Sequence, residues 1–141
     1  MYNICIIPAR KGSKRIKGKN IKIFFKKPMI EYSITAAKKS KCFKEILVST
    51  DCAKIAKIAR DLGAYVPKLR PKKLASDRIP VGDVISYSLK NIPNLNKIDF
   101  VCNINAASPL ISDFYIKKGL EIIKNNKYDY VFGVKEFESP I

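Results

Sequence analysis

The chain's 141 residues, 47% of them hydrophobic, suit one globular domain with its own core, and no apolar run approaches the roughly 20 residues that cross a membrane. Because histidine is absent and the four cysteines form no C-x-x-C pair, the composition excludes Ser-His-Asp and Cys-His catalysis and offers no standard zinc site. The net charge of +16 is compatible with nucleic-acid binding, but lysines occur throughout the chain and are mostly typical of a solvated surface. Only at residues 10–19 do lysines and arginines cluster together with glycines.

Residues 4–7 form a short apolar run that predicts a buried strand, which Pro8 ends. No basic segment precedes this run as in a signal peptide, so we expect a cytoplasmic protein. Residues 9–20 then form a loop, the basic loop, in which Gly12 and Gly18 lie among six lysines and arginines. Glycine lets backbone N–H groups approach a ligand and the basic side chains supply cations, so the loop predicts a site for a polyanion such as a nucleotide triphosphate. A solvated basic loop without a ligand is the alternative.

Helical and strand patterns alternate along the rest of the chain. In order, they predict an extended piece at 20–25, a helix at 29–39, a strand at 46–50, a helix around 55–62 that Gly63 caps, a strand at 64–66, a helix at 81–91, a strand at 100–104, a helix after Ser112 and a strand at 130–134. Apolar strands that alternate with helices predict an α/β fold, doubly wound around a mostly parallel sheet.

Ligands of doubly wound folds bind at the carboxyl ends of the strands. Three polar segments fall at such ends, namely 9–20, 50–51 and 105–109. Their predicted convergence favours a binding site over a solvated loop. The site matches neither common phosphate motif, because Gly12 and Gly18 have the wrong spacing for a P-loop and no G-x-G-x-x-G fingerprint occurs.

One longer motif runs from the first strand through the basic loop, Pro8-Ala9-Arg10-x-Gly12-Ser13-Lys14-Arg15-Ile16-x-Gly18-Lys19-Asn20-Ile21. Further motifs follow in order: Lys27-Pro28-Met29-Ile30-x-Tyr32-Ser33-Ile34, Val48-Ser49-Thr50-Asp51, Leu69-Arg70-Pro71, Leu74-Ala75-x-Asp77 and Ser108-Pro109-Leu110. Together, over most of the chain, they resemble the acylneuraminate (CMP-sialic acid synthetase) cytidylyltransferase family. Within that family the loop and the segment 129–141 are most similar to pseudaminic acid cytidylyltransferases.

The resemblance implies a Rossmann-like nucleotidyltransferase fold. It also implies a reaction in which CTP and a sialic-acid-like nine-carbon sugar acid, pseudaminic or N-acylneuraminic acid, give the CMP-sugar and pyrophosphate. Arg10 and Lys19 would be catalytic and hold the triphosphate. The nucleotide-binding residues that the resemblance implies are Pro8, Ala9, Arg10, Ser13, Lys19, Asn20, Arg70 and Asp77. Asn105 and Ser108 would contact the sugar, although Asn105 falls in a segment where sialic acid synthetases commonly have Gln-Pro-Thr-Ser-Pro.

The resemblance also implies Mg²⁺ as the cofactor and a homodimer at full length. In the family, the aspartates that bind the metal lie in a distal segment, so we expect them beyond Ile141. Residues 1–141 would then be the nucleotide-binding part of a truncated single domain, weak or inactive by itself. We expect neither a membrane nor a nucleic acid as partner. The alternatives are a 3-deoxy-manno-octulosonate cytidylyltransferase, a basic nucleic-acid-binding module and a degenerate fragment without activity.

Overall fold

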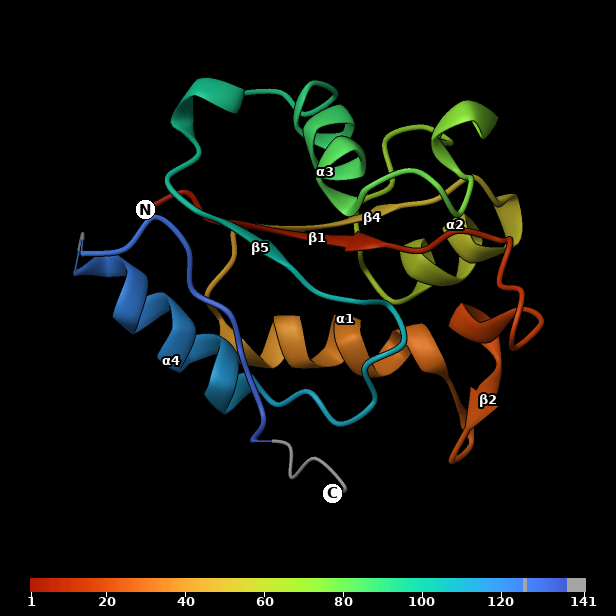
Figure 1. Cartoon of the computed structure of the whole chain (residues 1–141), viewed down its shortest axis with the longest axis horizontal. Helices are drawn as coiled ribbons and strands as arrows, with labels where there is room; N and C mark the ends of the chain where they lie inside the picture. The colour runs from red at the N-terminus through yellow and green to blue at the C-terminus, as the bar shows by residue number, and fades with distance from the viewer. Residues whose placement is uncertain (126, 137–141) are drawn as a thin grey trace, which may run out of the picture.

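Strands and helices alternate in the computed structural model, which describes residues 1–125 and 127–136 (Figure 1). The strands are β1 (Ile4–Pro8), β2 (Ile23–Phe24), β3 (Lys27–Pro28), β4 (Glu45–Ser49) and β5 (Val101–Asn103). The α-helices are α1 (Met29–Ser40), α2 (Ala53–Asp61), α3 (Val81–Leu89) and α4 (Asp113–Lys124), and short 3-10 helices occur at Lys19–Ile21, Lys72–Leu74 and Leu95–Lys97. Within these two ranges, no helix has both the length and the apolar character that crossing a membrane requires.

β1 lies at the centre of a parallel sheet whose strand order is β4-β1-β5. Ile4 of β1 is opposite both Glu45 of β4 and Val101 of β5, so the three strands start at the same level. Their carboxyl ends therefore meet at one edge of the sheet, the right-hand edge in Figure 1. The loops that follow these strands are brought together at that edge.

β1 is buried on both faces, which explains why its apolar residues follow one another without alternation. Cys5 and Ile7 point to the face that α1, α2 and α4 cover. Ile4 and Ile6 point to the opposite face, where Ile92 and the α3 residue Leu89 pack against them. Figure 1 shows α3 on one side of the sheet and α1 and α4 on the other. Helices on both faces of a parallel sheet confirm the predicted doubly wound α/β class.

The predicted strand at 64–66 is wrong in extent, since only Tyr65 contributes, through one parallel bridge to Leu47 of β4. Gly63 reaches this point in the left-handed conformation, at φ +79, and Pro67 has no N–H to continue a ladder. The chain therefore touches the edge of β4 once and turns away. Between 29 and 124, the other predicted helices and strands are confirmed to within a few residues of their expected ends.

The predicted extended piece at 20–25 is only partly correct. It begins inside the 3-10 helix Lys19–Ile21, and its second half forms the antiparallel hairpin β2–β3. Phe25 and Lys26 make the turn of this hairpin with φ values of +42 and +69, in the left-handed region. The hydroxyl of Tyr32 donates a hydrogen bond to the Phe24 carbonyl at 2.6 Å and so fastens the hairpin to α1.

The predicted strand at 130–134 does not form, because these residues belong to no strand in the described structure. Tyr130, Phe132 and Val134 have exposed fractions of 86%, 79% and 83%. A strand is stable when its N–H and C=O groups pair with a neighbouring strand, and a continuous apolar run does not by itself supply that neighbour. The end of the segment that carried the resemblance, 137–141, lies outside the described residues.

Candidate functional site

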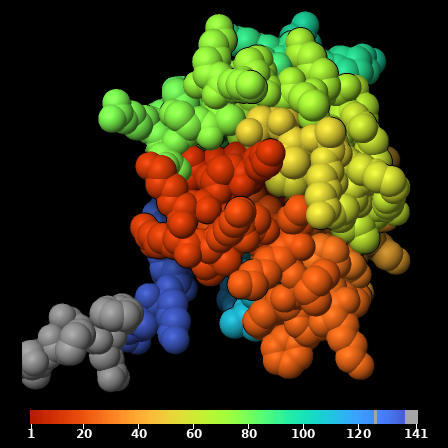
Figure 2. Space-filling view, turned by 90° about the vertical axis from the view of Figure 1, so that its right-hand side faces the viewer, coloured from red at the N-terminus to blue at the C-terminus, as the bar shows by residue number. Residues whose placement is uncertain are grey.

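The loops that leave β1 and β4 are joined by backbone hydrogen bonds at the carboxyl edge of the sheet. The Ala9 N–H donates to the Ser49 carbonyl at 2.9 Å, and the Arg70 N–H donates to the Thr50 carbonyl at 2.7 Å. Figure 2 looks onto this edge, where the red amino-terminal loop lies between the green segment above it and the orange hairpin region below. The predicted convergence of 9–20 with 50–51 is therefore confirmed, and the segment around Arg70 joins them.

Two polar side chains fold the basic loop onto the sheet. The carboxylate of Asp51 accepts a hydrogen bond from the Lys11 N–H at 2.8 Å, which ties the loop to the end of β4. Asn20 is buried, and its side-chain amide donates to the Arg10 carbonyl at 2.9 Å. The loop can return to this contact because Gly18 has a φ of +65, in the left-handed region that favours glycine.

Asp77 pairs with two cations of the basic loop. One carboxylate oxygen forms an ion pair with Arg10, and the other forms one with Lys14 at 2.6 Å. The hydrogen bond from Lys14, helped by that from Arg10, holds the pKa of the Asp77 carboxyl below its usual range. The Arg10 and Asp77 side chains are 33% and 32% exposed, so solvent reaches this pair and another anion can exchange with the carboxylate.

Arg70 places a buried cation beside the loop. Only 4% of the residue is exposed, and its Nε has no hydrogen-bond partner among the described atoms. Burial lowers the pKa of the Arg70 guanidinium; the negative Asp51 opposes this effect and the positive Arg10 adds to it. A buried N–H without a partner costs free energy, and an oxygen atom of a ligand would remove that cost.

Residues 4–140 match the cytidylyltransferase family. The chain belongs to that family. The match begins at the first residue of β1 and includes the basic loop, Asp51, Arg70 and Asp77, so it covers every contact of the site described above.

Two curated relatives have names that state an activity. A pseudaminic acid cytidylyltransferase from Campylobacter jejuni subsp. jejuni serotype O:2 is 39% identical over 142 residues, which cover 100% of this chain and 61% of that protein. An N-acylneuraminate cytidylyltransferase A from Danio rerio is 36% identical over 129 residues, which cover 92% of this chain and 29% of that protein. The chain thus spans less than two thirds of the length of either relative.

Solved structures agree with the fold. A CMP:2-keto-3-deoxy-manno-octonic acid synthetase complexed with CTP has a TM-score of 0.76 at 21% identity, covering 89% of this chain and 48% of that chain. The manganese complex of Rv0371c from Mycobacterium tuberculosis has a TM-score of 0.60 at 10% identity, covering 89% of this chain and 61% of that chain. Both likenesses concern the fold alone, and the second is a structure of this fold that holds a divalent cation.

The predicted nucleotide-binding residues of this chain lie on the basic loop and on the segments packed against it. Those residues are Pro8, Ala9, Arg10, Ser13, Lys19, Asn20, Arg70 and Asp77. Pro8 ends β1 and Ala9 is buried directly after it, whereas Ser13 and the exposed Lys19 lie further out on the loop. The side-chain amide of Asn20 donates its hydrogen bond within the loop, to the Arg10 carbonyl. Sequence reasoning assigned no role to Asp51, although its position directly after a strand was the available signal.

The predicted sugar-binding residues, Asn105 and Ser108, follow β5 at the same edge of the sheet. The Ile104 N–H donates to the Ile6 carbonyl of β1 at 3.1 Å, which continues the pairing of the two strands. The buried hydroxyl of Ser33 in α1 donates to the Asn105 carbonyl at 2.8 Å. These contacts hold the β5 loop beside the end of β1, and Asn105 itself is exposed.

The carboxylates near the loop do not form a ligand cluster for a divalent cation. In residues 1–125 and 127–136, no three His, Cys, Asp or Glu side chains are grouped so that they could hold a metal ion. Asp51 accepts the Lys11 N–H, and Asp77 pairs with two cations. A divalent cation at this site would need ligands besides these two residues.

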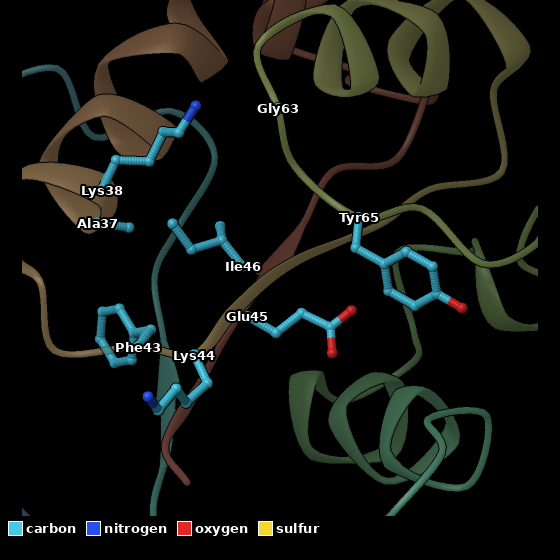
Figure 3. A pocket seen from close by; sticks show the side chains of 8 residues that line it. All are labelled: Ala37, Lys38, Phe43, Lys44, Glu45, Ile46, Gly63 and Tyr65. Carbon is cyan, nitrogen blue, oxygen red and sulfur yellow. The ribbon is translucent and has the colours of Figure 1, made fainter.

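Two cavities lie away from the basic loop. One, of about 340 Å³, is at the start of β4, and Figure 3 shows its Lys38, Lys44 and Glu45 side chains pointing in different directions. Lys38 donates a hydrogen bond to the Leu62 carbonyl at 2.7 Å, and burial raises the pKa of Glu45. The other, of about 320 Å³, lies between α1 and the start of α4. Polar groups do not converge in the first cavity, and the second lies between two helices, away from the carboxyl ends of the strands. The basic loop therefore stays the candidate site.

Proposed function

We propose that this cytidylyltransferase-family chain binds CTP at the carboxyl edge of its sheet and serves the transfer of CMP to a sialic-acid-like nine-carbon sugar acid. Pseudaminic acid is the substrate we favour, with N-acylneuraminic acid as the near alternative. One observation carries the proposal: Arg10 of the basic loop and the buried Arg70 of the segment beside it lie at this edge, in a chain 39% identical to a pseudaminic acid cytidylyltransferase.

In the proposed reaction, a hydroxyl of the sugar acid attacks the α-phosphorus of CTP. The bond between that phosphorus and the bridging oxygen to the β-phosphate breaks, and pyrophosphate leaves with the electron pair. Such a displacement needs alignment of the reactants and stabilisation of the charge on the leaving group, and it needs no histidine. Arg10 and Lys19 supply this positive charge, in agreement with a histidine-free chain.

The remaining residues position the nucleotide. Pro8 and Ala9 offer backbone groups at the end of β1, and Arg70 offers a buried guanidinium whose Nε has no partner among the described atoms. We assign Ser13 to the nucleotide as well, through its place on the basic loop. Asn20 acts by closing the loop on the Arg10 carbonyl. Asp77 acts on the nucleotide through Arg10 and Lys14, since it is paired with both.

The sugar acid would lie beside the β5 loop. Asn105 and Ser108 are the proposed contacts, and the hydrogen bond from Ser33 to the Asn105 carbonyl holds this loop in place. A 3-deoxy-manno-octulosonate cytidylyltransferase is the second candidate, because a synthetase for that sugar acid has the same fold with a TM-score of 0.76. Turnover with each of the sugar acids distinguishes the two.

The proposal includes Mg²⁺ as cofactor, a cytoplasmic location and a homodimer of the whole protein. Divalent cations neutralise triphosphate charge in such reactions, and no step above is assigned to the ion because the described carboxylates do not form its site. The dimer follows from the family resemblance alone.

Calorimetric titration of the purified chain with CTP, with and without Mg²⁺ and with ATP as control, tests the proposal. We expect saturable binding that prefers CTP. Arg10→Ala should abolish this binding, whereas Lys17→Ala, which removes an exposed cation of the same loop, should change it little. Equal losses in both variants would indicate diffuse charge attraction. Binding of DNA that falls steeply with salt, with no response to CTP, would favour a nucleic-acid-binding module instead.

A further inference from the structure

Two of the four cysteines occupy facing positions in the sheet. Cys5 of β1 and Cys102 of β5 are register partners in the parallel ladder. Paired residues of neighbouring strands point to the same face, and both cysteines contact the core cluster that α1, α2 and α4 cover. All four thiols, including Cys42 and Cys52, are unoxidised in the structure.

The distance between the two strands suits a disulfide. Neighbouring strands lie about 4.7–4.9 Å apart, and the Cα atoms of bridged cysteines are about 4.4–6.8 Å apart. The Cys5 and Cys102 thiols are close enough in the ladder for each to shift the pKa of the other. Because the register already places the two cysteines opposite each other, a bond between their sulfurs leaves the pairing of β1 with β5 unchanged.

The two thiols differ in ionisation and in access. The neighbouring Cys5 thiol lowers the pKa of Cys102, whereas Cys102 together with burial raises the pKa of Cys5. Cys5 is fully buried, whereas Cys102 is partly buried and lies on a strand of three residues. Cys102 is thus the thiol that ionises first and that a reagent reaches first.

We propose that Cys5 and Cys102 form a reversible intrachain disulfide, with a low-molecular-weight disulfide such as oxidised glutathione as the oxidant. The Cys102 thiolate attacks one sulfur of that reagent, and one small thiolate leaves with the electron pair. Cys5 then attacks the Cys102 sulfur, and its proton goes to the second small thiolate, which is released as a thiol. Two protein thiols are oxidised to one disulfide, and one small disulfide is reduced to two thiols.

The bond would have a structural effect near the candidate site, whether or not the proposed function holds. It would join β1 and β5 covalently, two strands whose carboxyl ends lead into the basic loop and into the Asn105–Ser108 segment. It would also close a loop of about 100 residues, which restricts the unfolded chain. The oxidised chain should therefore melt several degrees above the reduced chain.

Peptide mapping of the whole chain tests the proposal directly. The chain is equilibrated with mixtures of reduced and oxidised glutathione, its remaining thiols are alkylated under denaturing conditions, and it is cut with trypsin. Cys5 then lies in peptide 1–10 and Cys102 in peptide 98–117, while Cys42 and Cys52 lie in the separate peptides 42–44 and 45–54. We expect a linked pair of peptides 1–10 and 98–117 that reduction separates.

Two variants complete the test. Cys102→Ser should lose both the linked peptide and the rise in melting temperature. The double variant Cys42→Ser/Cys52→Ser keeps only the proposed pair and should retain both, and it gives an answer even if Cys102→Ser does not fold. The proposal is overturned if all four thiols persist at the most oxidising mixture, if glutathione stays on Cys102 as a mixed disulfide, or if the link involves Cys42 or Cys52.

Discussion

Arg10 of the basic loop forms an ion pair with Asp77, and Lys14 of the same loop pairs with the other oxygen of that carboxylate. The negative charge of Asp77 comes from a segment distant in sequence from the basic loop. It lies beside the two cations that the proposed triphosphate would bind. A triphosphate carries more negative charge than one carboxylate, so it can displace Asp77, but the displacement costs free energy. Asp77 therefore sets the affinity of the loop for anions.

The first prediction concerns Asp77→Asn. Removing one negative charge next to Arg10 and Lys14 should strengthen the binding of CTP about fivefold, because an unfavourable Coulomb interaction with the triphosphate is lost. Calorimetry measures the change. Asp61→Asn is the matched control, because Asp61 pairs with Lys57 on α2 and should leave the affinity unchanged. Weaker binding in Asp77→Asn would mean that the carboxylate orients Arg10 instead of competing with the ligand.

The second prediction is a pH dependence of stability. The pKa of Asp77 is lower in the folded chain than in the unfolded chain, mainly through the hydrogen bond from Lys14. As the pH falls, the unfolded state takes up the proton first, near pH 4, so the stability from this group is complete above that pH. It is lost as the pH falls through the folded-state pKa. Melting temperatures of wild type and Asp77→Asn should differ at pH 7 and converge as the pH falls through the folded-state pKa of Asp77; a constant difference contradicts this.

The basic loop and the doubly wound fold could be predicted from the sequence because both depend on local patterns. Apolar runs ended by Pro8 or by polar residues locate the strands, and glycines among lysines locate the loop. The pairing of Arg10 with Asp77 could not be predicted, because it depends on how the segment after Lys72–Leu74 returns across the sheet.

At residues 130–134 the local pattern predicts a strand that the structure does not form. Their continuous apolar run fits a buried strand locally, but a strand also needs a neighbour with which its N–H and C=O groups pair, and residues 130–134 belong to no strand in the described structure. The contact that Asn20 makes within the loop could not be predicted for a related reason. Its side chain could bind a nucleotide or the chain itself, and only the fold of the loop brings it to the Arg10 carbonyl.

The third prediction concerns Asp51→Ala. This change removes the acceptor of the Lys11 N–H and the negative charge that offsets the buried Arg70. Loss of the hydrogen bond and of the compensating charge should lower the free energy of unfolding by about 1–3 kcal/mol. Urea denaturation measures it, with the exposed Asp61→Ala as control.

A double-mutant cycle separates the two causes. If Asp51 stabilises the chain partly through Arg70, then Asp51→Ala should cost less in an Arg70→Met background than in the wild type, by about 0.5 kcal/mol or more. Equal costs in both backgrounds would assign the whole effect to the hydrogen bond with Lys11.

The fourth prediction concerns the hairpin turn that fastens the end of the basic loop to α1. Phe25 and Lys26 hold φ values of +42 and +69, and side chains in the left-handed region cost about 1 kcal/mol or more per residue. A two-residue turn of this kind favours Asn-Gly. Lys26→Gly should therefore raise the free energy of unfolding by about 0.5–1 kcal/mol, even though glycine adds freedom to the unfolded chain.

Lys22→Gly is the control for this prediction. Lys22 is also an exposed lysine beside the hairpin, but its φ is −64, so glycine relieves no strain there and only adds freedom to the unfolded chain. Urea denaturation should show that Lys22→Gly destabilises the chain while Lys26→Gly stabilises it. The same sign in both variants would mean that the turn is not strained, because backbone strain is what distinguishes the two lysines.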